Sequence, residues 1–313
     1  MTDPDAIKLL QKKLDGVRDE HDLKELASIL EYMPLAIVQA AAYIQEKGAR
    51  YSVRQYIKAF QRNEKQKTSL LNHEAGQLRR DPDAKNSIIV TWQISFDEIR
   101  EKWPASADLL SLMSYFDRQG IPTEVLRAKP QEAINNPRRQ DGDSTRDSDE
   151  DIEDSGASDV SGDDMFEEAV DRLRSYSFVS VGERGHTFEL HGLVQLATRK
   201  WLEIHKQDER WKAQFHMKLN IVFPPADHEN WDICETLFPH AKSAERHQPT
   251  ENTSVQDRAQ ILRKAGGYAL ARGEYAEAER MCEKSARALR KALGGDDVET
   301  LYSLGMLASK YRN

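Results

Sequence analysis

Histidines and cysteines are the side chains of this sequence that could act as nucleophiles or metal ligands, and their spacing offers little chemistry. The two cysteines, Cys234 and Cys282, are far apart, so there is no Cys-x-x-Cys pair and no four-cysteine zinc site. His186 and His191 lie five residues apart across an expected strand, which points their side chains to opposite faces and disfavours a shared zinc ion. His-Glu-x-x-His and Gly-x-Ser-x-Gly are also absent. We therefore expect no catalytic residue and no metal site.

The sequence also lacks the motif that nucleotide hydrolysis requires. A P-loop needs Gly-x-x-x-x-Gly-Lys-Ser/Thr, because its backbone N–H groups wrap the phosphates and its lysine neutralises them. No glycine of this sequence is followed by lysine. Since phosphoryl transfer depends on such positioning and charge neutralisation, we expect that the chain is not an enzyme.

Length and composition indicate a globular chain of two or three domains. The chain has 313 residues, of which 31% are charged and 39% hydrophobic. No apolar run approaches the ~18–20 residues that a membrane span needs, and the first residues do not form a signal peptide. Two cysteines suit a reducing compartment. We expect a cytoplasmic protein without a membrane partner.

The negative charge is concentrated in one segment. Between Asp141 and Asp164 there are eleven acids and one base, Arg146, whereas the formal net charge of the whole chain is -8. Such a run buries too little apolar surface to offset its ordering entropy, so we predict a disordered insertion over 129–163. A solvated linker is the simplest interpretation. The alternative is a site for an acid-directed kinase, which would use the serines Ser148, Ser158 and Ser161.

Most of the remaining sequence has helical spacing. Apolar residues recur three or four apart up to Gly16, and again up to Pro34, which fits the first turn of a third helix ending at Gly48. Ser52 and Gln55 form a capping box that opens a fourth helix. We expect a helical domain over 1–80.

A second domain is expected over 81–205. A helix begins after Asp81, the next helix is apolar nearly all round, and a short helix lies near 123–128. After the insertion comes a helix over 165–175, and then a β-hairpin with strands 178–181 and 187–190. This order, in which helices are followed by one β-hairpin, is typical of a winged-helix domain. DNA binding is disfavoured, because the helix over 165–175 carries acids as well as bases and adjoins the acidic insertion.

The last residues contain an internal repeat, in which an apolar pattern recurs 42 positions later. After a helical connector over 206–256, the region 257–313 repeats an apolar pattern; Leu262, Ala265, Gly266 and Ala269 match Leu304, Leu307, Ala308 and Tyr311. Residues 273–279 (GEYAEAE) have the pattern of the turn and second helix of a tetratricopeptide (TPR) repeat. Gly266 and Ala278 are the small residues at which the two helices must approach closely, and Tyr268 and Tyr275 complete the expected scaffold. One repeat is complete, and the second stops after its first helix.

Three segments together resemble NB-ARC proteins, the NLR-like signalling ATPases, and in particular the fungal NB-ARC/TPR group. The segments are 30–44 (LEYMPLAIVQAAAYI), 86–96 (NSIIVTWQISF) and 188–199 (FELHGLVQLATR). The resemblance implies a mainly α fold: a helical domain, a winged-helix domain with one β-hairpin, and an incomplete TPR α-solenoid. In that family, the proline of the first segment packs on adenine and the histidine of the third contacts the ADP β-phosphate. The matching residues are Pro34 and His191, although Gly192 stands where the family has a charged residue and the P-loop lobe is missing.

The sequence thus predicts a non-catalytic signalling and protein-interaction module that binds protein partners through its TPR segment. We expect no resident cofactor and no nucleic-acid partner. One alternative is a residual ADP-binding switch that needs a nucleotide-binding lobe in trans. Another is a truncated gene product without independent function.

Overall fold

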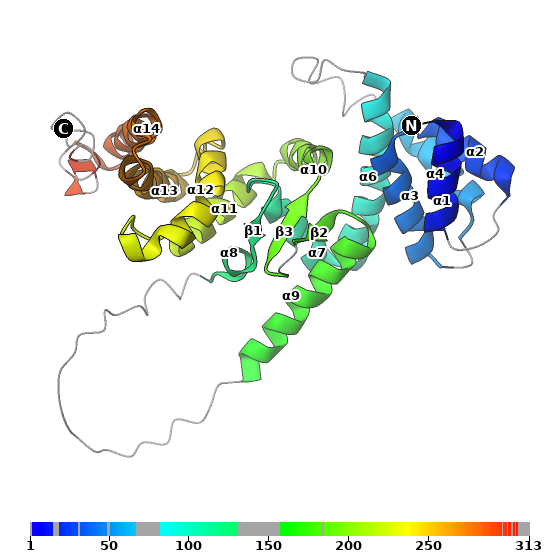
Figure 1. Ribbon diagram of the computed structural model, residues 1–313, viewed down its shortest axis with the longest axis horizontal. Helices are drawn as coiled ribbons and strands as arrows, with labels where there is room; N and C mark the ends of the chain where they lie inside the picture. The colour runs from blue at the N-terminus through cyan, green and yellow to red at the C-terminus, as the bar shows by residue number, and fades with distance from the viewer. Residues whose placement is uncertain are drawn as a thin grey trace. The chain divides into compact units, whose positions relative to one another are not determined.

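The computed structural model describes residues 2–14, 19–30, 32–48, 51–66, 82–129, 157–182 and 185–295, together with 297, 298, 300, 301, 303 and 305. The chain is mainly helical with one small antiparallel sheet, which confirms the predicted fold class (Figure 1). It divides into two compact units. The first contains Met1–Pro122 and Ala169–Lys212, and the second contains Thr123–Glu168 and Ala213–Asn313.

Helices make up most of the chain on both sides of the acidic insertion. Before it lie α1 (Asp3–Lys13), α2 (Glu20–Ile29), α3 (Pro34–Glu46), α4 (Val53–Gln66), α6 (Pro82–Lys102), α7 (Pro104–Met113), β1 (Ile121–Pro122) and α8 (Thr123–Arg127). After it come α9 (Ala157–Ser175), β2 (Val179–Val181), β3 (Thr187–Leu190), α10 (Gly192–Ile204), α11 (Asp208–Val222), the 3-10 turn η2 (His228–Asn230), α12 (Trp231–Arg246), α13 (Asn252–Ala271) and α14 (Tyr275–Leu293).

Local signals set the ends of the helices at the amino-terminal side. Pro34 occupies the first turn of α3, where a missing N–H leaves no hydrogen bond unmade. Gly48 ends the same helix with a φ of 77°, a conformation that favours glycine. The capping box before α4 is complete: the N–H of Ser52 donates to Oε1 of Gln55 at 2.7 Å, and the N–H of Gln55 donates to Oγ of Ser52 at 3.2 Å. These three expectations are confirmed.

Helix α6 is the central element of the first unit. Helices α3, α4, α7 and α10 all pack against it. Its side chains from 91 to 99 are buried or half-buried on every side, and Trp92, Phe96 and Ile99 are among the most buried. The ring of Trp92 stacks on Phe96, whose edge meets Trp201 of α10. The region predicted as the helical domain 1–80 and the start of the region 81–205 therefore share one core.

One buried carboxylate of α6 ties this core together. Glu98 is only 8% exposed; it accepts a hydrogen bond from the Tyr43 hydroxyl at 2.9 Å and forms ion pairs with Lys102 and Lys47. Burial by itself raises the pKa of Glu98, but the hydrogen bonds from Lys102, Lys47 and Tyr43 outweigh it and hold that pKa below its ordinary value. The carboxylate thus stays charged and joins α3 to α6.

The sheet has one strand more than the sequence predicts. The predicted hairpin is present as β2 and β3, with Val181 opposite Phe188. In addition, Ile121 and Pro122 form β1 and pair antiparallel with β3 opposite Phe188 and Thr187. Two residues carry too little pattern to indicate a strand, and only the partner strand β3 makes them one.

Helix α9 begins earlier than expected, which corrects one end of the predicted disordered insertion 129–163. Its first residue is Ala157, so residues 157–163 are helical, whereas residues 130–156 lie outside the described residues. Arg127 of α8 explains part of this extension, because it pairs with Asp163 at 2.8 Å and with Glu167 and lies over the ring of Phe166. A base on a neighbouring helix thus stabilises acidic residues that sequence composition alone assigns to a loop.

In the second unit, α13 packs between α12 and α14. Tyr268 is 2% exposed, and its ring meets Trp231 and Phe238 edge to face. Lys264 of α13 donates to the backbone carbonyls of Asn220 and Phe223 at the end of α11. A cation at a helix C-terminus is favourable, so α11 is also fixed to this layer.

A buried amide of α3 yields a test of this packing. Gln39 is fully buried, and neither its side-chain oxygen nor its nitrogen has a hydrogen-bond partner in the described part of the chain. Replacing it with methionine removes an unsatisfied polar group of similar size, so we expect Gln39→Met to raise the free energy of unfolding by about 1 kcal/mol. Urea unfolding followed by circular dichroism measures the change.

The matched control is Gln195, a buried glutamine whose Nε2 donates to the carbonyl of Phe116 at 2.8 Å. Gln195→Met removes a hydrogen bond that the folded protein forms, and it should lower the free energy of unfolding by about 1 kcal/mol or more. A loss of stability for Gln39→Met of the same size as for Gln195→Met would contradict the assignment.

Candidate functional site

His191 lies at the junction between β3 and α10, where it is the N-cap residue of the helix. Its Nδ1 accepts a hydrogen bond from the N–H of Leu193 at 3.2 Å. An N-cap acceptor satisfies one of the amides at a helix start that has no partner within the helix. The local structure therefore gives His191 a structural role that needs no ligand.

The surroundings of His191 favour its neutral form. Burial lowers the pKa of the imidazole below its ordinary value, and the positive charge of Arg118 lowers it further. A neutral ring is needed at this position, because Nδ1 must carry a lone pair to accept the bond from Leu193. Arg118 also lies beside Gly192: a Cβ at Gly192 would stand 3.5 Å from a guanidinium nitrogen. The guanidinium of Arg118 thus lies next to Gly192, the position at which the resembling family carries a charged residue.

Pro34, the second residue carried over from the resemblance, is exposed at the start of α3. Helices α3 and α10, which begin near Pro34 and His191, both pack against α6. The structure therefore places both residues on helices of one core.

The α13–α14 hairpin holds the four residues predicted to shape the interaction segment. Helices α13 and α14 approach each other closely at Gly266, where a Cβ would lie 2.5 Å from Sγ of Cys282 and 3.4 Å from the carbonyl oxygen of Ala278. No side chain larger than hydrogen fits this space without a shift of its neighbours. The close approach expected at Gly266 and Ala278 is present.

The two tyrosines of this set have different positions. Tyr268 is buried between α12 and α13, so it supports the hairpin and offers no surface. Tyr275, at the start of α14, is 56% exposed. Of the four residues, only Tyr275 can contact another protein directly.

The hairpin is followed by further helical residues at 298, 300, 301, 303 and 305. Thr300 and Ser303 are buried, and the hydroxyls of Ser303 and Ser285 of α14 are 3.4 Å apart. Val298 is 77% exposed. The second copy of the 42-residue repeat lies outside the described residues at its four matching positions: Leu304, Leu307, Ala308 and Tyr311.

The described residues also bear on three further kinds of site: a metal site, a phosphorylation site and a membrane span. Helix α2 brings ligand atoms of His21, Asp22 and Glu25 within 4.8 Å of one another, and Asp22 already lies 3.6 Å from Arg54. Ser148 lies outside the described residues, whereas Ser158 and Ser161 fall in α9. Within the described ranges, no helix combines the length and apolarity that crossing a membrane requires.

The cap made by His191 can be tested by substitution and pH. His191→Ala should lower the free energy of unfolding by about 1 kcal/mol, whereas His191→Asn, a good capping residue, should restore most of it. Since the folded pKa of His191 lies below its ordinary value of 6.5, the contribution of the cap is complete above that pH and is lost as the pH falls through the folded pKa. Urea unfolding at several pH values measures both effects. An equal pH dependence in the His191→Asn variant would contradict the cap.

The close approach of α13 and α14 can be tested by adding one methyl group. Gly266→Ala gains about 1 kcal/mol of helix propensity but places its Cβ against Cys282, so we expect a net loss of stability in both helices. Cys282→Ala removes the sulfur, and the double variant Gly266→Ala/Cys282→Ala should be more stable than Gly266→Ala alone. Amide hydrogen exchange in α13 and α14 is the measurement. Additive effects of the two substitutions would show that the two side chains do not meet.

A curated protein of Hyaloscypha variabilis, described as a "Nucleotide-binding leucine-rich repeat (NLR)-like protein", is similar to this chain. The two are 27% identical over 315 residues, which cover 97% of this chain and 28% of that protein. The chain thus spans little more than a quarter of the length of its relative. No family model matches the chain, and no solved structure matches it either. The similarity over nearly the whole chain supports an NLR-like relationship.

Proposed function

We propose that this chain is a non-catalytic signalling and protein-interaction module of the NB-ARC/TPR type, which acts through packing between its helical parts and through partner binding by a TPR segment. The relationship to an NLR-like protein supports a signalling role in general. The observation that carries the interaction role is the α13–α14 hairpin, whose helices pack tightly at Gly266 and which is continued by helical residues that pack on α14.

The packing of this hairpin supports the proposal of a TPR repeat. Two antiparallel helices bury their small residues against each other, α12 packs on α13, and Ser303 of the next helical residues lies against Ser285 of α14. Such units cannot bury their apolar faces alone and gain stability from their neighbours. The exposed side chains of Tyr275 and Val298 offer apolar surface to a neighbour or a partner.

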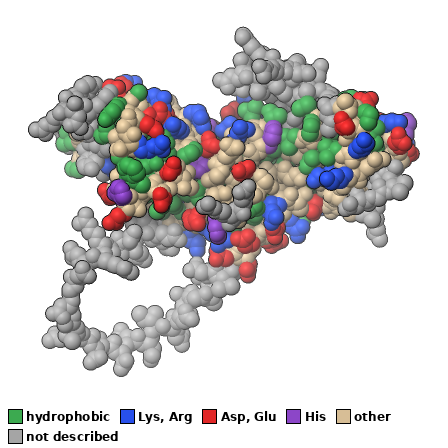
Figure 2. Space-filling model, in the orientation of Figure 1, with side chains coloured by type: hydrophobic (Ala, Val, Ile, Leu, Met, Phe, Trp, Pro, Cys, Tyr) green, Lys and Arg blue, Asp and Glu red, His purple; other side chains and the backbone are tan. Residues whose placement is uncertain are grey.

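The winged-helix assignment rests on the order of the elements after α4. Helices α6, α7, α8 and α9 are followed by the hairpin of β2 and β3, which β1 extends to three strands. On the visible face of the molecule, Lys and Arg side chains are interspersed with Asp and Glu side chains (Figure 2). Helix α9 pairs Arg174 with its own Asp171 at 3.1 Å. A recognition helix for nucleic acid needs bases that are not matched by acids on the same helix, so we propose proteins as the partners.

Nucleotide turnover has no place in this function. The sequence contains no Gly-Lys pair, and the cap already engages Nδ1 of His191. No phosphate release from ATP above that of the buffer is expected from the purified chain.

Proximity labelling in the native cells tests the interaction role. The chain is fused to a labelling enzyme and compared with three variants: Gly266→Ala, Gly266→Ala/Cys282→Ala and His191→Ala. We expect the labelled proteins to be lost with Gly266→Ala, to return with the double variant and to persist with His191→Ala. Hydrogen exchange confirms that only the hairpin is loosened in the first variant. Labelling no greater than that of the free enzyme would favour a gene product without independent function.

A second candidate is a residual ADP-binding switch that is completed by a nucleotide-binding lobe in trans. The observation in its favour is the exposed guanidinium of Arg118 beside His191 and Gly192, because a cation next to that histidine suits a phosphate group. Calorimetry with ADP separates the candidates. Micromolar binding that is abolished by both His191→Ala and Arg118→Ala would replace the first proposal with the second.

A further inference from the structure

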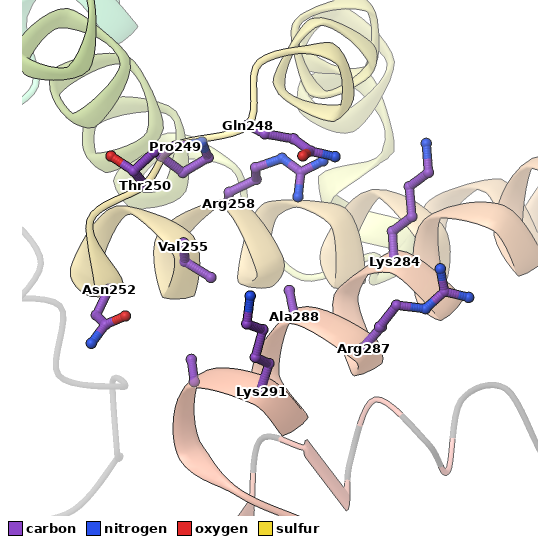
Figure 3. Close-up of a pocket in the computed structure, with 11 residues that line it drawn as sticks. Gln248, Pro249, Thr250, Asn252, Val255, Arg258, Lys284, Arg287, Ala288 and Lys291 are labelled. Carbon is purple, nitrogen blue, oxygen red and sulfur yellow. The ribbon is translucent and has the colours of Figure 1, made fainter.

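A groove of about 530 Å³ lies in the second unit, bounded by the loop before α13, the first turns of α13 and the last turns of α14 (Figure 3). Gln248 and Pro249 come from the loop, and Asn252 and Val255 come from the start of α13. Figure 3 shows Lys291 rising from α14 toward α13. The volume lies in the range of ordinary ligand pockets.

The lining of this groove has one sign of charge. Four of its residues are basic and none is acidic: Arg258, Lys284, Arg287 and Lys291. Arg258 is 5% exposed and fixed as part of the wall, because its guanidinium donates to the backbone carbonyls of Ala244 and Glu245. The other three bases stand on α14 and can face a ligand.

The nearest acids leave a net positive charge. The carboxylate of Glu245 bonds both Lys284, at 2.7 Å, and Arg280, at 2.9 Å. Burial alone raises the pKa of Glu245, but these two cations outweigh it and lower that pKa, so one negative charge is shared by two positive ones. Glu283 pairs with Arg287 on the exposed surface, where such a pair is weak. In the described part of the chain, Lys291 has no acidic partner.

The bases form a stripe and do not converge on a point. Lys284, Arg287 and Lys291 follow at i, i+3 and i+7, so they occupy one face of α14 over about 10 Å. In an extended peptide, side chains two residues apart point to the same face and lie about 7 Å apart, so carboxylates at every second position span a length similar to that of the stripe. The apolar part of the lining comes from Val255, Ala288 and Ala292. A compact polyphosphate would need cations gathered around one centre, whereas this lining fits an elongated chain.

We propose that this groove binds an extended acidic segment of a partner protein, with carboxylates at every second position to meet Lys284, Arg287 and Lys291 and small side chains between them. Gln248 and Asn252 can hydrogen-bond its backbone at the rim. The inference rests on the proposed interaction function and names the chemistry of one partner.

Fluorescence anisotropy with a labelled peptide, Glu-Ala-Glu-Ala-Glu, tests the proposal on the full chain. The control peptide carries Gln in place of each Glu. Lys291→Gln should weaken binding of the acidic peptide by about tenfold, the cost of one charge-assisted hydrogen bond. The matched variant is Arg290→Gln, which removes the same charge one residue away but outside the groove lining, and it should leave the affinity nearly unchanged. Rising salt should weaken the peptide complex.

Three results would overturn the proposal. Equal losses for Lys291→Gln and Arg290→Gln would show attraction to general charge, and tighter binding of tripolyphosphate than of the peptide would show a site for compact anions. Peptide binding that appears only when the acids between 141 and 154 are changed to Asn and Gln would show that the chain's own acidic stretch is the occupant. If the peptide does not bind, but Gly266→Ala and the double variant still change the labelling of partner proteins, the proposed function stands and only the assignment of the groove is wrong.

Discussion

Burial of the middle of α6 on all sides is the constraint on which the first unit depends. Four helices use this element as their common surface, so no one of them forms a separate core. A helix buried in this way must also bury its polar residues, and Glu98 shows how the cost is met: one carboxylate accepts from Tyr43 and pairs with two lysines. The result is an electrostatic link between α3 and α6, the helices that carry two of the three segments behind the family resemblance.

The second unit is held together by a different constraint, the distance between α13 and α14. Gly266 allows the two helices to meet with only a sulfur and a carbonyl between them. The contact needs no charge and no ligand, and it fixes the angle at which α14 presents Tyr275 at one end and the basic stripe at the other. Surface for recognition is thus a consequence of packing, which fits a module that acts by binding.

The two candidate sites differ in what they demand of the rest of the protein. His191 is already satisfied by the helix that it caps, so a nucleotide would find only one ring nitrogen and the nearby Arg118. The groove beside α14 is formed entirely by the second unit and has its charges in place.

The sequence by itself determined the features that depend on a few neighbouring residues. Pro34, Gly48 and the Ser52–Gln55 box set helix ends because their effects act within one turn, and the spacing around Gly266 indicated a close helix pair. The tertiary structure alone decided the features that join distant segments: the pairing of β1 with β3, the extension of α9 by Arg127, and the charge of the groove. Two residues cannot show a strand period, and an acidic run cannot show that a base lies on another helix. Such features arise only when the chain brings their partners together.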